Sequence, residues 1–460
     1  MFQRKVLKNL KKWAAKPKRK PLILRGARQV GKTTLVDEFA RQFDIYLHLN
    51  LEDKRAKALF DEDFSINELV SQIFLFCNKS RLQGKSILLF IDEIQQSPAA
   101  IARLRYFYED VPDIFVIAAG SLLETLISTQ ISFPVGRVEY LAVRPCSFCE
   151  FLVATGETEL EKAINQHSIS NAIHSKAMSL FHTFTFTGGM PEIVQHFAEN
   201  RDFVALNDIY ETLLTSYRDD VEKYAANDTM RHTIRYILKE GWSYAMQRIT
   251  LGSFAGSSYK SREMGEAFRT LEKTMLLELV YPTTSACLPA PSDLNRSPKL
   301  IWNDVGLVNY AAQIQNEIFG SKDMLDAYRG KIAEQIVAQE LFSHETRVSA
   351  HRSFWVREKK GSDAEVDFVI QYDSHIIPVE VKSGHNAKLR SLHSFMDTAS
   401  HNIAVRVWSQ PFSVDEVRTP SGKTFKLINL PFYYVGIIRE ILADFLKPAI
   451  NFYGYNMDII

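Results

Sequence analysis

The sequence predicts an α/β protein of several domains, and three observations lead to that class. At 460 residues the chain exceeds what one hydrophobic core usually supports. Apolar runs in its first third are typical of strands buried on both faces of a parallel sheet, and shorter alternating strands recur near its C-terminus. Hydrophobic residues make up 46% and charged residues 24%, with 55 basic against 54 acidic side chains, which excludes a disordered or strongly basic protein. Any nucleic-acid binding must therefore come from local patches.

The first apolar strand runs into a glycine-containing turn and then a helical pattern, in the stretch LILRGARQVGKTTL at residues 22–35. Gly26 and Gly31 allow a P-loop, a tight turn whose amides point at phosphate oxygens, and the following helix offers its positive end to the same anion. Lys32 can reach the β- and γ-phosphates, and the Thr33 hydroxyl can bind Mg²⁺. If this were an ordinary turn before a helix, the strand, both glycines and the Lys-Thr pair would occur together only by coincidence. The residues predicted to bind a nucleoside triphosphate are Gly26, Ala27, Arg28, Gln29, Val30, Gly31, Lys32, Thr33 and Thr34.

Two further apolar runs end in polar residues. The run SILLFI at residues 86–91 ends in Asp92 and Glu93, which is a Walker B pattern. The first carboxylate is expected to hold Mg²⁺ through water and the second to polarise the attacking water. The run IFVIAA at residues 114–119 precedes a glycine and Ser121, which makes Ser121 a candidate γ-phosphate sensor at the same edge of the sheet.

These motifs resemble those of AAA+ type P-loop ATPases over residues 21–152. The run GRVEY that contains Arg137, the run RPCSFCEF at residues 144–151 and the run GGMPE at residues 188–192 are similar to elements of a prokaryotic subgroup. The resemblance implies ATP and Mg²⁺ as cofactors and ATP hydrolysis as the activity. Arg137 is expected either to contact nucleotide, in the same chain or from a neighbouring subunit of a homo-oligomer, or to form a structural ion pair.

The N-terminal segment is basic, with nine Lys and Arg and no acidic residue before residue 21. It could be a nucleic-acid arm, but the spacing of Val6, Leu7, Leu10 and Trp13 favours a short amphipathic helix on the first domain. The chain has only four cysteines, too few for a disulfide framework, and no apolar run long enough to cross a bilayer. We therefore expect a cytoplasmic protein with no membrane partner.

The pair Cys146-x-x-Cys149 has no second pair to complete a zinc site and no thioredoxin-like context, so no metal or redox chemistry is expected there. The middle of the chain reads as helical and ends in an amphipathic helix near residues 261–279. This pattern predicts either a winged helix-turn-helix, which could bind DNA, or a packing module of the same shape.

The C-terminal part carries a second group of chemistry-bearing residues. A helix that opens at Gly330 contains Glu334, the strand VDFVI contains Asp367, and the strand VEVK carries Glu380 and Lys382. Period-two alternation places Glu380 and Lys382 on one face, and Asp367, at the start of an exposed phase, joins them if the strands are neighbours. Three carboxylates with a lysine can hold divalent cations for phosphodiester hydrolysis. A solvated sheet face is the alternative.

This constellation resembles the PD-(D/E)XK restriction-endonuclease-like core. The resemblance implies that Asp367 and Glu380 bind metal, that Lys382 positions water or stabilises charge, and that Glu334 assists. With the strand KLIWNDVGL at residues 299–307, most of the chain is similar to a prokaryotic family that fuses an AAA+ like ATPase to a C-terminal domain of unknown function (type 4143).

The predicted division of the chain is an ATPase domain, a helical lid, a winged-helix-like region, a nuclease-like domain and a tail, over residues 1–152, 153–225, 226–290, 291–435 and 436–460 respectively. The leading hypothesis is an ATPase whose nucleotide state controls a DNA-associated, metal-dependent nuclease domain. The alternative is an ATP-driven interaction switch whose nuclease-like domain binds without cutting. A small-molecule phosphotransferase is disfavoured because it gives the extra domains no purpose, and no protein partner can be named.

Overall fold

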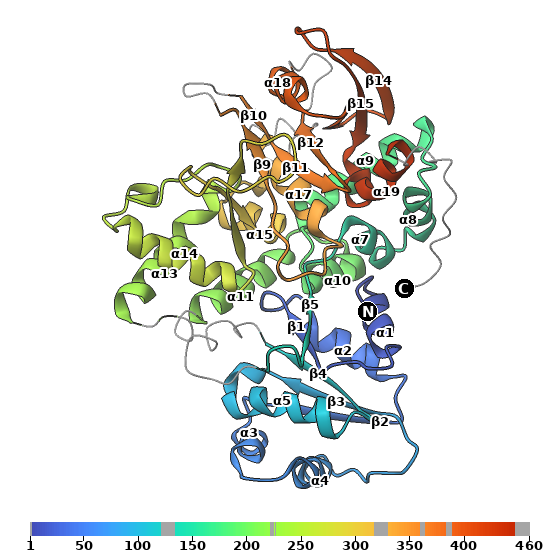
Figure 1. Cartoon of the computed structure of the whole chain (residues 1–460), viewed down its shortest axis with the longest axis vertical. Coiled ribbons are helices and arrows are strands. Elements are labelled where there is room, and N and C mark those ends of the chain that lie inside the picture. The colour runs from blue at the N-terminus through green and yellow to red at the C-terminus, as the bar shows by residue number, and fades with distance from the viewer. Residues whose placement is uncertain are drawn as a thin grey trace.

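The first third of the chain folds around a five-stranded sheet in the order β2-β3-β4-β1-β5, seen at the lower end of the computed structural model in Figure 1. All of its neighbouring strands are parallel. The three apolar runs of the sequence form its central strands, which confirms them as buried strands. The strands are β1 (Leu22–Arg25), β2 (Ile45–Asn50), β3 (Ile87–Asp92), β4 (Ile114–Ala119) and β5 (Glu139–Ala142).

Helices cover both faces of this sheet. One face packs against α1 and α2, and the other against α3, α4 and α5. Leu7, Leu10 and Trp13 are buried on α1, which packs against α2, so the prediction of an amphipathic N-terminal helix is confirmed. The helices are α1 (Leu7–Ala14), α2 (Lys32–Ala40), α3 (Lys54–Asp61), α4 (Ile66–Phe76), the 3-10 turn η1 (Ile94–Gln96) and α5 (Pro98–Asp110).

A helical region follows, and its core is rich in phenylalanine. Phe148, Phe151, Phe181 and Phe184 pack ring against ring, so α7 and α9 form one unit. The helices are α7 (Phe148–Ala154), α8 (Thr158–Asn165), α9 (Asn171–Thr187), α10 (Pro191–Asn200), α11 (Leu206–Asp219), α13 (Asp228–Glu240), η2 (Gly241–Tyr244), η3 (Phe254–Gly256) and α14 (Ser261–Lys273).

Two helices and a two-stranded hairpin make up the next region, and the winged-helix-like shape stays a prediction. Helix α14 packs on α13 and buries the apolar face expected for it, including Met264, Phe268 and Leu271. The hairpin pairs β6 (Leu277–Val280) with β8 (Lys299–Trp302) antiparallel. Trp302 of β8 stacks on Trp242 with ring centroids 3.6 Å apart, which fixes the hairpin against the helices.

The C-terminal part contains a mixed five-stranded sheet in the order β11-β12-β13-β15-β14. Helix α17 and the turn η5 cover one face, and α18 covers the other. The elements are α15 (Val305–Ala311), α17 (Lys331–Phe342), β11 (Phe368–Tyr372), β12 (His375–Val381), α18 (Arg390–Thr398), β13 (Ile403–Trp408), β14 (Ser413–Arg418), β15 (Thr424–Pro431), η5 (Phe432–Ile437) and α19 (Ile438–Phe445). A small sheet of β7 (Pro282–Thr283), β9 (Phe354–Val356) and β10 (Glu365–Val366) lies beside it, with β9 in the middle.

The structure describes residues 2–120, 134–220, 225, 227–316, 330–358, 364–382 and 389–446. No helix among these residues is both long and apolar enough to cross a membrane. Cys146 and Cys149 are buried with free thiols, and burial raises the pKa of both. The thiols are therefore neutral core groups in this part of the chain.

A largely buried ion pair joins the hairpin to the segment before β9, because Arg352 bonds to Glu278 of β6. Burial alone would raise the pKa of Glu278, but the charge and hydrogen bonds of Arg352 and His351 lower it to about 2. This carboxylate therefore stabilises the fold fully above its unfolded pKa of about 4.5, and the contribution is lost as the pH falls from there toward 2.

Glu278→Gln is expected to destabilise the chain by about 3–5 kcal/mol at neutral pH, because it leaves the Arg352 charge buried without its partner. Its unfolding midpoint should also depend less on pH between about 4.5 and 2 than the wild-type midpoint does. Thermal unfolding across this pH range measures both effects. The exposed Glu416→Gln on β14 is the matched control, and equal midpoints for the two variants at neutral pH would contradict the prediction.

Candidate functional site

The P-loop lies between β1 and α2, where both of its glycines are required. Gly31 has φ of 85° and Gln29 has φ of 62°, both in the left-handed region. A Cβ on Gly26 would collide with the carbonyl oxygen of Val143, beside the end of β5. The turn is therefore tight enough for the strand to pass directly into the helix.

Lys32 begins α2 and points back into the loop. Its Nζ donates hydrogen bonds to the carbonyl oxygens of Gly26 at 3.0 Å and Ala27 at 2.8 Å. Burial lowers the pKa of Lys32 to about 8, although the carboxylates of Glu93 and Asp92 act in the opposite direction. The ammonium is held at the mouth of the loop, where it can move from these carbonyls to phosphate oxygens.

The structure brings Asp92 and Glu93 to the P-loop. Asp92 is only 7% exposed, and its Oδ2 accepts a hydrogen bond from the Thr33 hydroxyl at 2.7 Å. This pair of oxygen ligands fits Mg²⁺, which prefers hard oxygen donors. Glu93 has φ of 52°, accepts a hydrogen bond from Gln95, and has its pKa raised by burial. Its carboxylate is therefore held close to the predicted Mg²⁺ position.

A cavity of about 670 Å³ opens over these groups, which is within the usual range for small-molecule sites. The sequence reasoning found its lining from the P-loop and from Asp92 and Glu93. It missed the part of the lining that comes from elsewhere in the chain, which is Phe2, Arg4, Glu38, Pro191, Glu192 and Gln195.

Arg4 is the most informative of the missed residues, because it is buried although it belongs to the basic N-terminal segment. It donates hydrogen bonds to the carbonyl oxygen of Val30 at 3.1 Å, to that of Arg144 at 2.7 Å, and to Glu150 at 3.0 Å. Glu150 is the buried acid of the run RPCSFCEF. An acid between apolar residues of this run needs a basic partner from elsewhere in the chain, and this was the signal available in the sequence. Arg4 ties the N-terminal segment to the P-loop.

Two predicted nucleotide contacts stay predictions. Ser121 lies outside the described residues. Arg137 donates to Glu109 of α5 at 2.7 Å, the structural ion pair that the sequence left open as one alternative, and it does not line the described cavity.

The run GGMPE packs against the run KLIWNDVGL. Gly188 and Gly189 approach Asp304 and Gly306 so closely that a Cβ on Gly188 or on Gly306 would collide with the opposite run. The amide of Gly189 donates to Asp304 Oδ2 at 2.6 Å, and the amide of Leu307 donates to Oδ1 at 3.0 Å. Asp304 therefore caps α15 and holds the turn that leads into α10.

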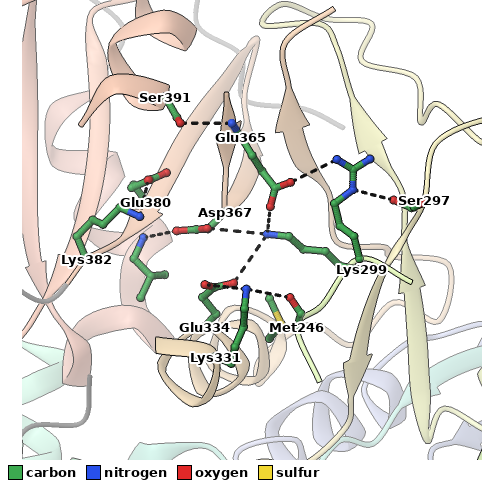
Figure 2. A network of polar contacts seen from close by, with 12 residues as sticks. Met246, Ser297, Lys299, Lys331, Glu334, Glu365, Asp367, Glu380, Lys382 and Ser391 are labelled. Carbon is green, nitrogen blue, oxygen red and sulfur yellow. Dashed lines mark hydrogen bonds and ion pairs between the residues drawn. The ribbon is translucent and has the colours of Figure 1, made fainter. Parts of the chain in front are cut away.

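Figure 2 shows the second predicted group of residues, in the C-terminal part. Glu334 on α17, Asp367 between β10 and β11, and Glu380 and Lys382 at the end of β12 lie in one region. Strands β11 and β12 are antiparallel neighbours, and Asp367 Oδ2 accepts a hydrogen bond from the amide of Val381 at 2.8 Å. The predicted gathering of these residues is confirmed.

The predicted exposure of Asp367 is wrong, since its exposed fraction is 7%. Strand alternation indicates which face a side chain takes but not what covers that face, and here α17 and the β6-β8 hairpin cover it. Burial and the charge of Asp367 raise the pKa of Glu334 to about 7 and that of Glu380 to about 8. Within the described ranges no group of three or more His, Cys, Asp or Glu side chains is arranged to hold a metal ion. The metal role of Glu334, Asp367 and Glu380 is not supported by this arrangement.

Comparison with known proteins identifies parts of the chain. Residues 18–152 match the model of an AAA domain, residues 178–318 a domain of unknown function (DUF8612), and residues 329–433 a domain of unknown function (DUF4143). The chain therefore carries a P-loop ATPase domain of the AAA type followed by a DUF4143 domain. This ATPase family supports ATP binding and hydrolysis.

A curated relative is an uncharacterized protein of Methanocaldococcus jannaschii, 26% identical over 169 residues, which are 35% of this chain and 33% of that protein. The chain thus spans about a third of the length of this relative. Among solved structures, the Walker-type ATPase PABY2304 of Pyrococcus abyssi is 13% identical with a TM-score of 0.43, covering 68% of this chain and 96% of that one. The Thermotoga maritima RuvB Holliday junction branch migration motor is 16% identical with a TM-score of 0.29, covering 61% and 90%. These structural likenesses are too low to carry an argument about function.

Proposed function

We propose that this protein is an ATP-driven switch, in which nucleotide bound at Lys32, Thr33, Asp92 and Glu93 sets the position of the C-terminal DUF4143 domain. One observation carries the proposal. The segment from Gly188 to Gln195 touches the nucleotide cavity at one end and Asp304 at the other. A change at the phosphates therefore has a short path to the C-terminal part of the chain, through this segment and its hydrogen bond to Asp304.

The cavity end of this segment is the start of α10. Pro191 and Glu192 line the cavity, and the Pro191 ring lies against Gly31 of the P-loop. Phosphates bound by the loop amides would meet these residues directly. Nucleotide binding is thus expected to shift or fix the beginning of α10.

The other end of the segment reaches α17 through two side chains. Asp304 accepts a hydrogen bond from Gln339 of α17 at 3.4 Å, and Gln339 accepts one from the amide of Val305 at 2.8 Å. On the same helix, Glu340 accepts a hydrogen bond from the amide of Phe148 at 3.1 Å. Helix α17 is therefore bonded both to α15 and to the helical region that follows the ATPase sheet.

A second link leaves the P-loop toward α11. The guanidinium of Arg28 pairs with Asp220, which follows α11, and the Tyr217 hydroxyl donates to the Arg28 carbonyl at 3.0 Å. Arg28 therefore joins the loop to the helical region by side chain and backbone. Movement of the loop on binding phosphate would be transmitted along this helix too.

Hydrogen exchange tests the switch. Adding a non-hydrolysable ATP analogue with Mg²⁺ is expected to slow amide exchange in the P-loop and to change it in α10, α15 and α17 as well. Lys32→Met, which removes the ammonium that reaches the phosphates, should abolish both responses. A response confined to the P-loop and its immediate surroundings would contradict the proposal.

A second candidate is a nucleotide-controlled, metal-dependent nuclease acting on DNA. The observation that favours it is that Glu334 Oε2 and Glu380 Oε2 are buried and accept no hydrogen bond, since such oxygens are available to a cation. This candidate requires DNA cleavage with Mg²⁺ or Mn²⁺ that is lost in Asp367→Ala. The switch requires no cleavage and survives that substitution.

A further inference from the structure

Lys299 is a buried lysine at the centre of the carboxylates of the C-terminal domain (Figure 2). It is 2% exposed, and its Nζ lies 2.7 Å from Glu365 Oε1. The same Nζ lies 3.9 Å from Glu334 Oε2 and 3.9 Å from Asp367 Oδ1. The Phe354 ring covers it from another side, with the centroid 4.8 Å away. One buried ammonium thus faces three carboxylates, of which Glu334 and Glu365 are partly exposed.

The cluster contains equal numbers of acidic and basic side chains. Its four carboxylates are Glu334, Glu365, Asp367 and Glu380, and its four cations are Lys299, Lys331, Lys382 and Arg248. Lys331 lies 3.5 Å from Glu334, Lys382 lies 3.0 Å from Glu380, and Arg248 lies 3.7 Å from Glu365. Each carboxylate therefore has a cation at hand, and no excess of negative charge is left to attract a divalent ion.

The position of the ammonium conflicts with a metal ion shared by Asp367 and Glu334. A Mg²⁺ ion binds carboxylate oxygens at about 2.0–2.1 Å, so an ion on Asp367 and Glu334 would stand within a few ångströms of Lys299. Like charges at that distance in a buried site repel strongly. Asp367 and Glu334 together therefore do not fit a divalent cation while Lys299 is in place.

We infer that Lys299 is the resident cation of this cluster and takes the place that a divalent metal ion has in a metal-dependent nuclease. Lys299 belongs to β8, which pairs with β6 and is not part of the β11-β12 sheet. Through its ion pairs, the ammonium therefore links the β6-β8 hairpin to the DUF4143 sheet. The cluster is a joint between two parts of the chain and leaves the domain without metal-dependent cleavage.

The strand that carries Lys299 supports a structural role for this side chain. All four residues of β8 are buried, so Lys299 stands in a strand that is otherwise apolar. A lysine buried in such a strand is tolerated only when carboxylates and other acceptors compensate its charge. Removing the lysine leaves Glu334, Glu365 and Asp367 facing one another without that compensation.

Mn²⁺ titration of the full chain without nucleotide, followed by electron paramagnetic resonance and by thermal unfolding, tests this inference. Wild type is expected to show no Mn²⁺ site that depends on Asp367. Lys299→Met should unfold at a lower temperature, gain one Mn²⁺ site, and recover part of its midpoint when Mn²⁺ is added. Adding Asp367→Asn to Lys299→Met should remove the new site, and Lys299→Arg, which keeps the charge, should behave as wild type.

Two outcomes overturn the inference. One is a Mn²⁺ site in wild type that Asp367→Asn abolishes, a comparison that needs no Lys299 variant and holds even if Lys299→Met does not fold. The other is a folded Lys299→Met that gains no site. Neither measurement involves ATP, so a failure here leaves the nucleotide switch untouched.

Discussion

Replacing Glu93 by glutamine is expected to leave ATP bound and to slow its hydrolysis by about 100-fold or more, which is the usual contribution of a positioned general base. Glutamine keeps the size of the side chain but cannot accept a proton from water. Lys32, Thr33 and Asp92, the groups proposed to hold nucleotide and Mg²⁺, are unchanged by this substitution. Steady-state phosphate release together with a binding titration of ATP separates the two effects.

The matched control for Glu93→Gln is Glu52→Gln. Glu52 is exposed and its charge also acts on Glu93, so the control removes a nearby negative charge but no group that touches water at the phosphates. Its hydrolysis rate is expected to stay close to that of wild type. A Glu93→Gln variant with the same rate as Glu52→Gln would show that another residue activates the water.

The position of the nucleotide site could be predicted from the sequence because of the geometry of parallel sheets. Strands β1 and β3 were visible as apolar runs, and each ends in the residues that carry the chemistry. The carboxyl ends of parallel strands meet at one edge of the sheet, so Thr33 and Asp92 could be placed together before their contact was seen. In such a fold, the sequence pattern that predicts a strand also predicts where the residues at its end lie in the tertiary structure.

The residues that the sequence reasoning missed are brought in by packing between distant segments. Arg4 reaches the P-loop because α1 packs beside α2, and no local pattern contains that information. Lys299 likewise enters the carboxylate cluster from a strand of another sheet. A motif of alternating Glu and Lys predicts neighbours on one strand, but the charge balance of a buried site depends on every element that covers it.

The link between Gly189 and Asp304 also lay beyond the sequence, although both motifs were recognised in it. The glycines of GGMPE and of NDVGL are separated by more than a hundred residues, and each motif alone reads as an ordinary turn. Their mutual contact explains the glycines, because a side chain on Gly188 or Gly306 has no room. The meaning of each motif became clear only from the position of the other.

Asp304→Asn is expected to abolish the response of α15 and α17 to nucleotide while ATP hydrolysis continues. Asparagine can keep its Oδ1 as the acceptor for the amide of Leu307, and so still caps α15. It places an NH₂ group where Oδ2 accepts from the amide of Gly189, and two donors cannot bond to each other. The substitution therefore breaks the link to the turn that leads into α10 and spares the cap.

The cost of Asp304→Asn in stability is expected to be about 1–3 kcal/mol, because the amide of Gly189 stays buried without an acceptor. Burial raises the pKa of Asp304 to about 6, although the amides of Gly189 and Leu307 act against that shift, so the wild-type carboxylate is ionised above that pH and accepts both bonds. Measurements are best made near pH 7.5, where this holds.

Hydrogen exchange with and without the ATP analogue, combined with phosphate release, measures the effect of Asp304→Asn. Asp228→Asn, at an exposed position in the first turn of α13, makes the same chemical change away from the turn that leads into α10 and should respond as wild type. If α17 of Asp304→Asn still responds to nucleotide, the signal must travel through Arg28 and α11 instead. If hydrolysis is lost along with the response, the turn is part of the nucleotide site itself, because the cap and the P-loop are intact in this variant.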